Sequence, residues 1–268
     1  MGNSRLTPRV LLLGFAAAAP VIALALIRTH IVFALAPLFL SHLLLLFATL
    51  APNNQWWGPV INTFRTEEPE VWVTIDDGPS PAHTLQMLDL LDRFEARATF
   101  FVIGKHAEQH PHLITEILAR GHSVANHTFS HQHSTFWAAG PARIAREIDR
   151  CSETLRSTPT RPNLLFRAPV GMKSPFLHSA LERRRLALIG WTVRGLDTVL
   201  HSAEAVVARV EKGAKHGAII VLHEGHQTER DPGFSVRCLE LTLERLSARG
   251  YRFIIPTAAQ LGIARDGR

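Results

Sequence analysis

The 268-residue sequence has two cysteines, no acidic residue in its first fifty positions and no run of more than three basic residues. Cys151 and Cys238 provide neither a disulfide framework nor a CxxC metal site. After position 50 the chain holds 26 basic and 23 acidic residues, and aromatic side chains are not interleaved with basic ones. We therefore expect no nucleic-acid partner. The length suits one large domain, and no internal repeat divides it.

The first fifty positions lack acidic residues because most of them belong to two long uncharged segments. Residues 10–27 form a stretch of 18 residues without a charge, and residues 31–50 form another of 20. Because about 20 apolar residues cross the core of a bilayer, both are candidate membrane helices. We predict that residues 1–52 form a membrane anchor of two transmembrane helices, joined by the short Arg-Thr-His turn at 28–30.

A single segment, cleaved or uncleaved, is the alternative to this helical pair. The sequence ALAP at 34–37 resembles a signal-peptide cleavage site, although the second long segment and the proline argue against cleavage. Arg5 and Arg9 precede the first segment, whereas Arg28 alone lies in the turn. The positive-inside rule then favours a cytoplasmic location for both the N-terminus and the domain that follows two spans. With only one span, that domain would lie outside.

The rest of the chain divides into a connection, a domain and a tail. Residues 53–67 are predicted to be a linker, 68–262 the soluble domain and 263–268 a short tail. Trp56 and Trp57 stand where an interfacial aromatic belt belongs, and they would equally suit a domain core.

Short β-rich runs alternate with helical patterns beyond residue 70. Gly121 and Gly250 suit helix C-terminal caps, and Ser80 with Pro81 suits a helix start. This alternation predicts an α/β fold with a parallel sheet or barrel. The seven expected strands are residues 71–75, 98–102, 122–126, 164–166, 186–193, 218–222 and 251–255.

Polar residues follow most of these strands, and the carboxyl ends of parallel strands share one face of the fold. The candidates in chain order are Asp76, Asp77, His127, His131, Arg167, Asp197 and His223. By itself the DDGP stretch at 76–79 would suit a solvated turn, since Asp, Gly and Pro are ordinary turn residues. A turn does not explain why the other polar residues gather on the same face.

These residue types favour metal-assisted hydrolysis. His127 and His131 are four positions apart, so a helical turn would point both imidazoles the same way. Together with one carboxylate they suit zinc or a similar divalent ion. Among 15 histidines an HxxxH pair also arises by chance. A cation would offset the repulsion between the two neighbouring aspartates.

Of the two aspartates, one would complete the metal site and the other would act as general base toward water. Arg167 would keep that base ionised, and His223 would protonate the leaving group. This set of groups suits hydrolysis of an amide or ester. We expect His133, His106, His110 and His112 to be surface or loop residues, and His30 and His42 to face a helix contact or the membrane interface.

Five short motifs carry a resemblance to a known family. They are TIDDGP at 74–79, HTFSH at 127–131, RAPVG at 167–171, WTVRGLDT at 191–198 and VLH at 221–223. In this order they resemble the motifs of the polysaccharide deacetylases of the NodB-homology family, carbohydrate esterase family four. The resemblance covers residues 68–262.

The resemblance implies a distorted (β/α) barrel and metal-dependent removal of an N- or O-acyl group from a sugar. It implies Asp76 as the base, with Arg167 orienting it, and His223 as the acid. It also implies that the Val170 N–H helps to stabilise the oxyanion. The implied metal ligands are Asp77, His127 and His131.

The fourth motif departs from the family pattern. The family commonly has Asp-x-x-Asp-Trp, whereas this chain has Arg194 and Asp197 at the two acidic positions and a threonine in place of the tryptophan. We expect Asp197 to be the partner of His223. Arg194 suggests either an anionic group on the substrate or a structural salt bridge. The family also often has tyrosine at the position of Val170, but a backbone N–H does not need that side chain.

Three functions remain open at this point. The first is de-N-acylation, most simply deacetylation, of an amino sugar in a cell-envelope glycan at a bacterial plasma membrane. The second is deacylation or deformylation of a sugar linked to a polyprenyl phosphate. The third is a metal-binding pseudoenzyme that acts as a scaffold. The sequence predicts zinc and membrane attachment, and it does not determine the oligomeric state.

Overall fold

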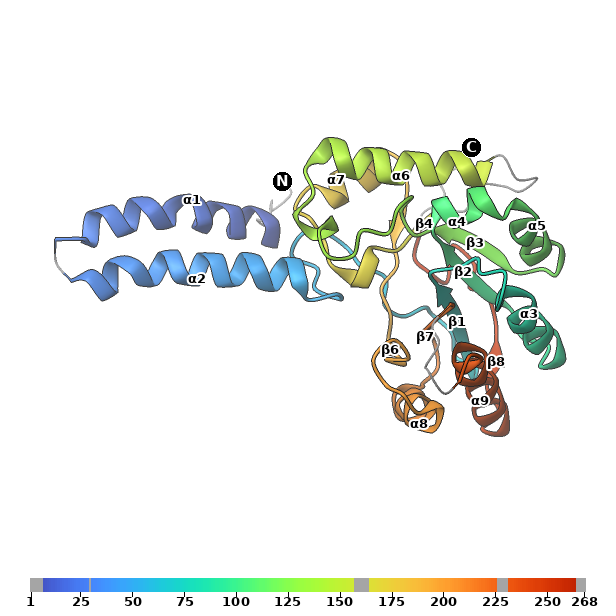
Figure 1. Cartoon of the computed structure of the whole chain (residues 1–268). Helices are drawn as coiled ribbons and strands as arrows, with labels where there is room; N and C mark the ends of the chain where they lie inside the picture. The colour runs from blue at the N-terminus through green and yellow to red at the C-terminus, as the bar shows by residue number, and fades with distance from the viewer. Residues whose placement is uncertain (1–6, 29, 157–163, 226–230, 264–268) are drawn as a thin grey trace.

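A computed structural model describes residues 7–28, 30–156, 164–225 and 231–263. Two long N-terminal helices lie side by side and project from an α/β domain (Figure 1). In that domain a parallel sheet is covered by helices, and the candidate polar residues follow its strands. Arg5 and Thr29, which bear on the predicted orientation and turn, lie outside the described residues.

The two projecting helices are α1 (Pro8–Leu26) and α2 (Ile31–Leu50). Each is long and apolar enough to cross a membrane. Most of the exposed large apolar side chains of the described residues lie on them, so they are not core helices of a soluble domain. The buried positions between them are mainly small residues, as at helix contacts within membranes.

The sheet has eight strands, and all of its ladders are parallel. Its order is β5-β4-β3-β2-β1-β7-β6, while β8 pairs with the first residues of β1. The strands are β1 (Glu70–Asp76), β2 (Ala98–Val102), β3 (Ser123–Asn126), β4 (Leu165–Phe166), β5 (Ala187–Leu188), β6 (Val193–Arg194), β7 (Ala218–His223) and β8 (Arg252–Phe253).

Alternation along the strands separates two apolar layers. On β1, Val73 and Ile75 pack with the surrounding helices, whereas Trp72 packs inside the curled sheet. Because side chains alternate along a strand, Thr74 and Asp76 point to the same inner face of the sheet as Trp72. The candidate site lies at the end of that face. The covering helices are α3 (Thr84–Arg93), α4 (Gly104–Gln109), α5 (Pro111–Ala119), α6 (Pro141–Arg156), α7 (Leu177–Glu182), α8 (Ala203–Gly213) and α9 (Phe234–Ala248), with 3-10 turns η1 (Phe136–Ala138) and η2 (Pro169–Gly171).

The two glycines expected to cap helices do so, whereas the expected helix start at Ser80 is displaced. Gly121 and Gly250 have φ of +79° and +80° after α5 and α9, which is the conformation of a capping glycine. Helix α3 begins at Thr84 rather than at Ser80, because the Ser80 carbonyl accepts from the N–H groups of His83 and Thr84 in a turn before the helix.

The strand predicted at 186–193 is instead two strands at opposite ends of the sheet. β5 pairs with β4, and β6 pairs with β7, so residues 189–192 cross between the two edges. Residues 61–64 bridge the same gap, since Ile61 pairs with Ile189 and Thr63 with Ala218. Hydrogen bonding to this segment interrupts the strand. The expected distorted (β/α) barrel is confirmed.

The end of α2 is fastened to the domain. The N–H of Lys173 donates to the Thr49 carbonyl at 2.9 Å, and its Nζ donates to the carbonyls of Ala51 and Pro52 at 2.6 and 2.7 Å. These bonds satisfy carbonyls that a helix C-terminus leaves without partners. Trp57 donates its indole N–H to Thr49 Oγ1 and is 2% exposed, so it belongs to the packed junction.

Candidate functional site

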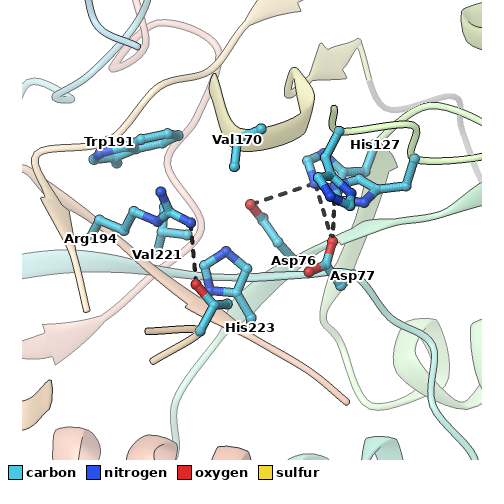
Figure 2. Close-up of a pocket in the computed structure, with 11 residues that line it drawn as sticks. Asp76, Asp77, His127, Val170, Trp191, Arg194, Val221 and His223 are labelled. Atoms are coloured by element: carbon cyan, nitrogen blue, oxygen red, sulfur yellow. Dashed lines mark hydrogen bonds and ion pairs between the residues drawn. The ribbon is translucent and has the colours of Figure 1, made fainter. Parts of the chain in front are cut away.

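A cavity of about 340 Å³ opens at the carboxyl ends of the strands (Figure 2). Arg167 and Asp197 lie behind its wall and contact lining residues. The lining residues are Asp76, Asp77, His127, His131, His133, Val170, Trp191, Arg194, Thr198, Val221 and His223. The sequence-predicted residues are therefore brought together, although they come from segments far apart in the chain.

Three of them form a candidate metal site. Asp77 Oδ1 lies 3.5 Å from His127 Nε2 and 3.2 Å from His131 Nε2. The three ligand atoms lie within 4.8 Å of one another. Tetrahedral zinc, with ligand distances of about 2.0–2.2 Å, separates its ligand atoms by roughly 3.3–3.5 Å. The donor set and its spacing therefore fit a divalent ion.

Each histidine turns a ring nitrogen toward Asp77. His127 Nδ1 lies 2.9 Å from the carbonyl of Arg167, which can only accept, so Nδ1 carries the proton and Nε2 faces Asp77. Burial, with the neighbouring His127, lowers the pKa of His131 to about 4, so its ring is neutral at pH 7.

The prediction that His127 and His131 share a helical turn is wrong. They lie in a loop after β3, where Thr128 and His131 have φ of +68° and +47°. The loop places the two rings 4.7 Å apart, so four-residue spacing brings them together without a helix.

Asp76 has a different environment from its neighbour. Arg167 Nη1 donates to Asp76 Oδ1 at 2.6 Å and to Thr74 Oγ1 at 2.8 Å, while Nη2 donates to the Gly190 carbonyl. Arg167 is fully buried, and its guanidinium lies 4.0 Å above the ring of Phe101. Burial lowers the pKa of Arg167, and the charge of Asp76 opposes that change. The ion pair fixes the orientation of the Asp76 carboxylate.

His223, on the strand next to that of Asp76, pairs with Asp197. Its Nδ1 lies 2.8 Å from Asp197 Oδ1, and its backbone N–H donates to Oδ2 at 2.6 Å. Burial lowers the pKa of His223, but the charge and hydrogen bond of Asp197 outweigh it, so the pKa is raised overall. Register pairs Asp76 with His223 on adjacent strands.

Strained backbone surrounds the cavity. Val170 has φ +50°, a left-handed conformation that β-branched residues rarely adopt. Asp77 and His131 also have positive φ. Among the described hydrogen bonds the Val170 N–H has no acceptor, and Val170 lines the cavity. Backbone strain of this kind concentrates at functional sites, where surrounding packing maintains it.

Four lining residues were not predicted as site residues. His133, expected on the surface or in a loop, is exposed, but it also lines the cavity. Trp191 and Thr198 lie within the fourth motif and Val221 lies within the fifth, so the motifs offered a signal for all three. Arg194 donates weakly to Thr198 Oγ1 at 3.4 Å and lies over the Trp191 ring. It forms no ion pair with a carboxylate in the described ranges, so the salt-bridge interpretation gains no support.

Glu224 was also missed, because nothing in the sequence marks it. It is 2% exposed, and Oε1 accepts from the Ser80 N–H at 2.9 Å and from the Thr84 hydroxyl. Its own N–H donates to the Asp76 carbonyl at 2.8 Å. Burial raises the pKa of Glu224 to about 7. Glu224 thus ties the turn after Asp77 to the strand that carries His223.

Comparison with known proteins agrees with this geometry. The family model for polysaccharide deacetylase matches residues 64–186. A chitooligosaccharide deacetylase of Bradyrhizobium sp. (strain ANU 289) is 32% identical over 193 residues, which cover 72% of this chain and 85% of the relative. The chain belongs to the polysaccharide deacetylase family.

Two further relatives extend the similarity to envelope enzymes. A peptidoglycan-N-acetylglucosamine deacetylase of Bacillus cereus is 32% identical over 184 residues, covering 68% of this chain and 84% of the relative. The crystal structure of the Bc1960 peptidoglycan N-acetylglucosamine deacetylase is 25% identical with a TM-score of 0.67. That match covers 76% of this chain and 92% of the other.

The candidate metal site yields a first prediction. The double variant His127→Ala and His131→Ala should lose tight binding of zinc, because one carboxylate remains of three ligands. Metal content after dialysis, measured by mass spectrometry, tests this, with circular dichroism to verify folding. His133→Ala is the matched control from the same loop and should retain its metal. Stoichiometric zinc in the folded double variant would contradict the site.

Proposed function

We propose that the protein removes the N-acyl group, most simply acetyl, from an amino sugar of a cell-envelope glycan. Membership of the polysaccharide deacetylase family makes it a hydrolase of carbon–nitrogen bonds other than peptide bonds. The observation that carries the proposal is the pairing of two acid–base groups, Asp76 with Arg167 and His223 with Asp197, around one candidate metal site. A pseudoenzyme scaffold would need neither pair.

The side chains divide the reaction between them. Asp76, oriented by Arg167, accepts a proton from the attacking water as general base. His223 donates a proton to the departing amine nitrogen, and Asp197 orients its ring. The Val170 N–H stabilises the oxyanion that develops on the acyl carbonyl. Loss of one such donor typically costs about 2.7–4 kcal/mol of transition-state stabilisation.

We assign the metal role to Asp77, His127 and His131, with zinc as the preferred ion. Two neutral imidazoles and one carboxylate suit zinc, and three protein ligands leave an open position, as catalytic zinc sites do. A divalent ion here would lower the pKa of water and polarise the acyl oxygen.

A membrane setting follows from the two apolar helices. We propose that α1 and α2 both span the bacterial plasma membrane as a hairpin, because their apolar side chains are exposed and α2 is fastened to the domain. Arg9 donates to Ser179 Oγ at 3.2 Å, so the start of α1 lies at the domain end of the hairpin. By the positive-inside rule this end faces the cytoplasm.

An anionic group on the substrate is a second element of the proposal. Arg194 lines the cavity, and its Nε is buried without a hydrogen-bond partner in the described part of the chain. A carboxylate or phosphate on the sugar would provide that partner. This favours a sugar attached through phosphate to a membrane lipid, the second candidate substrate, over a neutral chitin-like polymer.

The two neighbouring aspartates should behave differently. Wild-type protein is expected to release acetate from N-acetylated chitooligosaccharide, and a chelator should stop this reversibly. Asp76→Asn should retain metal but lose turnover by about 10²–10⁴-fold, because the general base is absent. Asp77→Asn should lose the metal itself. Acetate release and metal content are measured on the same folded samples; equal metal retention and equal activity loss would contradict the assigned roles.

The pH dependence should report the Asp197–His223 pair. A general acid works in its protonated form, so activity is present below its pKa and falls as pH rises through it. Asp197 raises the pKa of His223. Asp197→Asn should therefore move the alkaline limb of the kcat profile to lower pH. Asp89→Asn, an exposed carboxylate on α3, is the control. An unmoved limb with reduced kcat would show that Asp197 does not tune His223.

The orientation in the membrane can be measured directly. Alkaline phosphatase or a fluorescent protein that folds only in the cytoplasm is fused after Arg268. The hairpin predicts a fluorescent fusion and an inactive phosphatase fusion. Active phosphatase with a dark fluorescent fusion would place the catalytic domain outside and favour finished wall polymer as substrate.

A further inference from the structure

A second cavity, of about 430 Å³, lies between the end of α2 and the catalytic domain. Its lining is almost wholly apolar. The residues come from α2 (His42, Leu45, Leu46, Thr49), the junction (Trp57), the η1 turn (Trp137, Ala138, Ala139) and the loop before α7 (Ser174, Pro175, Phe176). Ligand-binding cavities of proteins commonly have this size and character.

One wall of this cavity is a face of the predicted membrane helix. His42, Leu45, Leu46 and Thr49 are spaced i, i+3, i+4 and i+7, so they line one side of α2. At 1.5 Å per residue they lie within about 12 Å of its end. When α2 spans the bilayer, this depth is within the apolar layer nearest the catalytic domain. Hydrocarbon, rather than water, therefore borders the cavity.

The apolar cavity is also close to the catalytic one. Val170 lines the catalytic cavity and Ser174 lines the apolar cavity, four residues further along the same loop. Even a fully extended chain limits their Cα separation to about 14 Å, at 3.3–3.6 Å per residue. Lys173, between them, is fully buried and holds the end of α2 through Ala51 and Pro52. The loop thus fixes both cavities relative to the membrane helix.

The positively charged side chain of Arg194 lies on the side of this loop that faces the catalytic cavity. Gly171 is in close contact with Pro52 and Trp191, and Arg194 lies next to Trp191. A phosphate placed between a sugar in the catalytic cavity and a chain in the apolar cavity would be a suitable partner for this guanidinium.

We propose that the apolar cavity binds the hydrocarbon chain of the substrate, a lipid-linked N-acyl amino sugar that enters from the bilayer. The inference rests on the proposed deacylase function and on insertion of α2. It deepens that function by naming a lipid-binding site and the residues that form it. Ordinary bilayer lipid is the competing occupant.

The test compares two substrates with the same sugar, using full-length protein in phospholipid vesicles. One is soluble N-acetylchitotetraose, and the other is N-acetylglucosamine linked by phosphate to a polyisoprenoid chain. Ala138→Trp fills the cavity from an exposed position, and Phe176→Ala removes part of its wall. Each should lower kcat/KM for the lipid-linked sugar about tenfold more than for the soluble sugar, a ratio equal to 1.4 kcal/mol of lost binding.

Leu85→Ala is the matched control. Leu85 lies on α3 and is 44% exposed, close to the 47% of Phe176, but it does not line the cavity. It should leave the ratio of the two rates unchanged. If the cavity variants lose kcat/KM equally on both substrates, or lose none, the lipid site is overturned. The deacylase function would remain intact.

A binding measurement separates failure of the site from failure of the function. A polyisoprenyl phosphate with a photoreactive chain should crosslink to the segments around Ala138 and Phe176, and Ala138→Trp should reduce the yield. If ordinary phospholipid competes equally well with the photoreactive probe for crosslinking, the cavity would be assigned to bilayer lipid. Absence of turnover on both substrates by metal-loaded wild type would instead refute the deacylase function, whatever the crosslinking shows.

Discussion

The buried ion pair between Arg167 and Asp76 is the interaction on which the site depends. Arg167 follows β4, and its guanidinium donates to β1 and to the crossing segment at Gly190, so it connects three parts of the barrel. Because both charges are excluded from water, removal of one typically costs about 3–5 kcal/mol. The pair therefore holds β1, the residue after β4 and the crossing segment together and fixes the orientation of the Asp76 carboxylate. The carbonyl of Arg167 also orients His127, so one residue connects the proposed base to the candidate metal site.

Strain at the site is maintained by contacts outside the cavity. Asp77 and Val170 have left-handed backbone conformations. Each is followed by a turn or loop that residues outside the cavity hold through hydrogen bonds. Glu224 accepts hydrogen bonds from the turn after Asp77, while Lys173 holds the loop that follows Val170. Packing of this kind keeps unusual conformations populated, which pre-organises the donor and ligand groups. Helix α2 takes part in this support, because carbonyls at and just after its end accept hydrogen bonds from Lys173.

If α2 spans a membrane as proposed, its rigid junction with the domain would link substrate supply to the bilayer. A flexible tether would leave the domain free to search the surrounding glycan, whereas α2 is joined to the domain by hydrogen bonds and by the packed side chain of Trp57. The candidate catalytic cavity is consequently held in a fixed position relative to α2. Such an arrangement suits a substrate that is itself held in the membrane.

The sequence by itself determined the alternation of strands and helices, the two apolar helices and the grouping of Asp76, Asp77, His127, His131 and His223 on one face. These follow from local periodicity and from the rule that parallel strands end together. Only the tertiary structure decided that residues 186–193 divide between two edges, that the HxxxH pair lies in a loop, and that Glu224 and Lys173 support the site. Those outcomes depend on hydrogen bonds between segments far apart in the chain, such as Ser130 with Glu147, His127 with Arg167 and Lys173 with Ala51. Spacing along a chain carries no information about such contacts, whereas burial imposes them, because buried polar groups need partners.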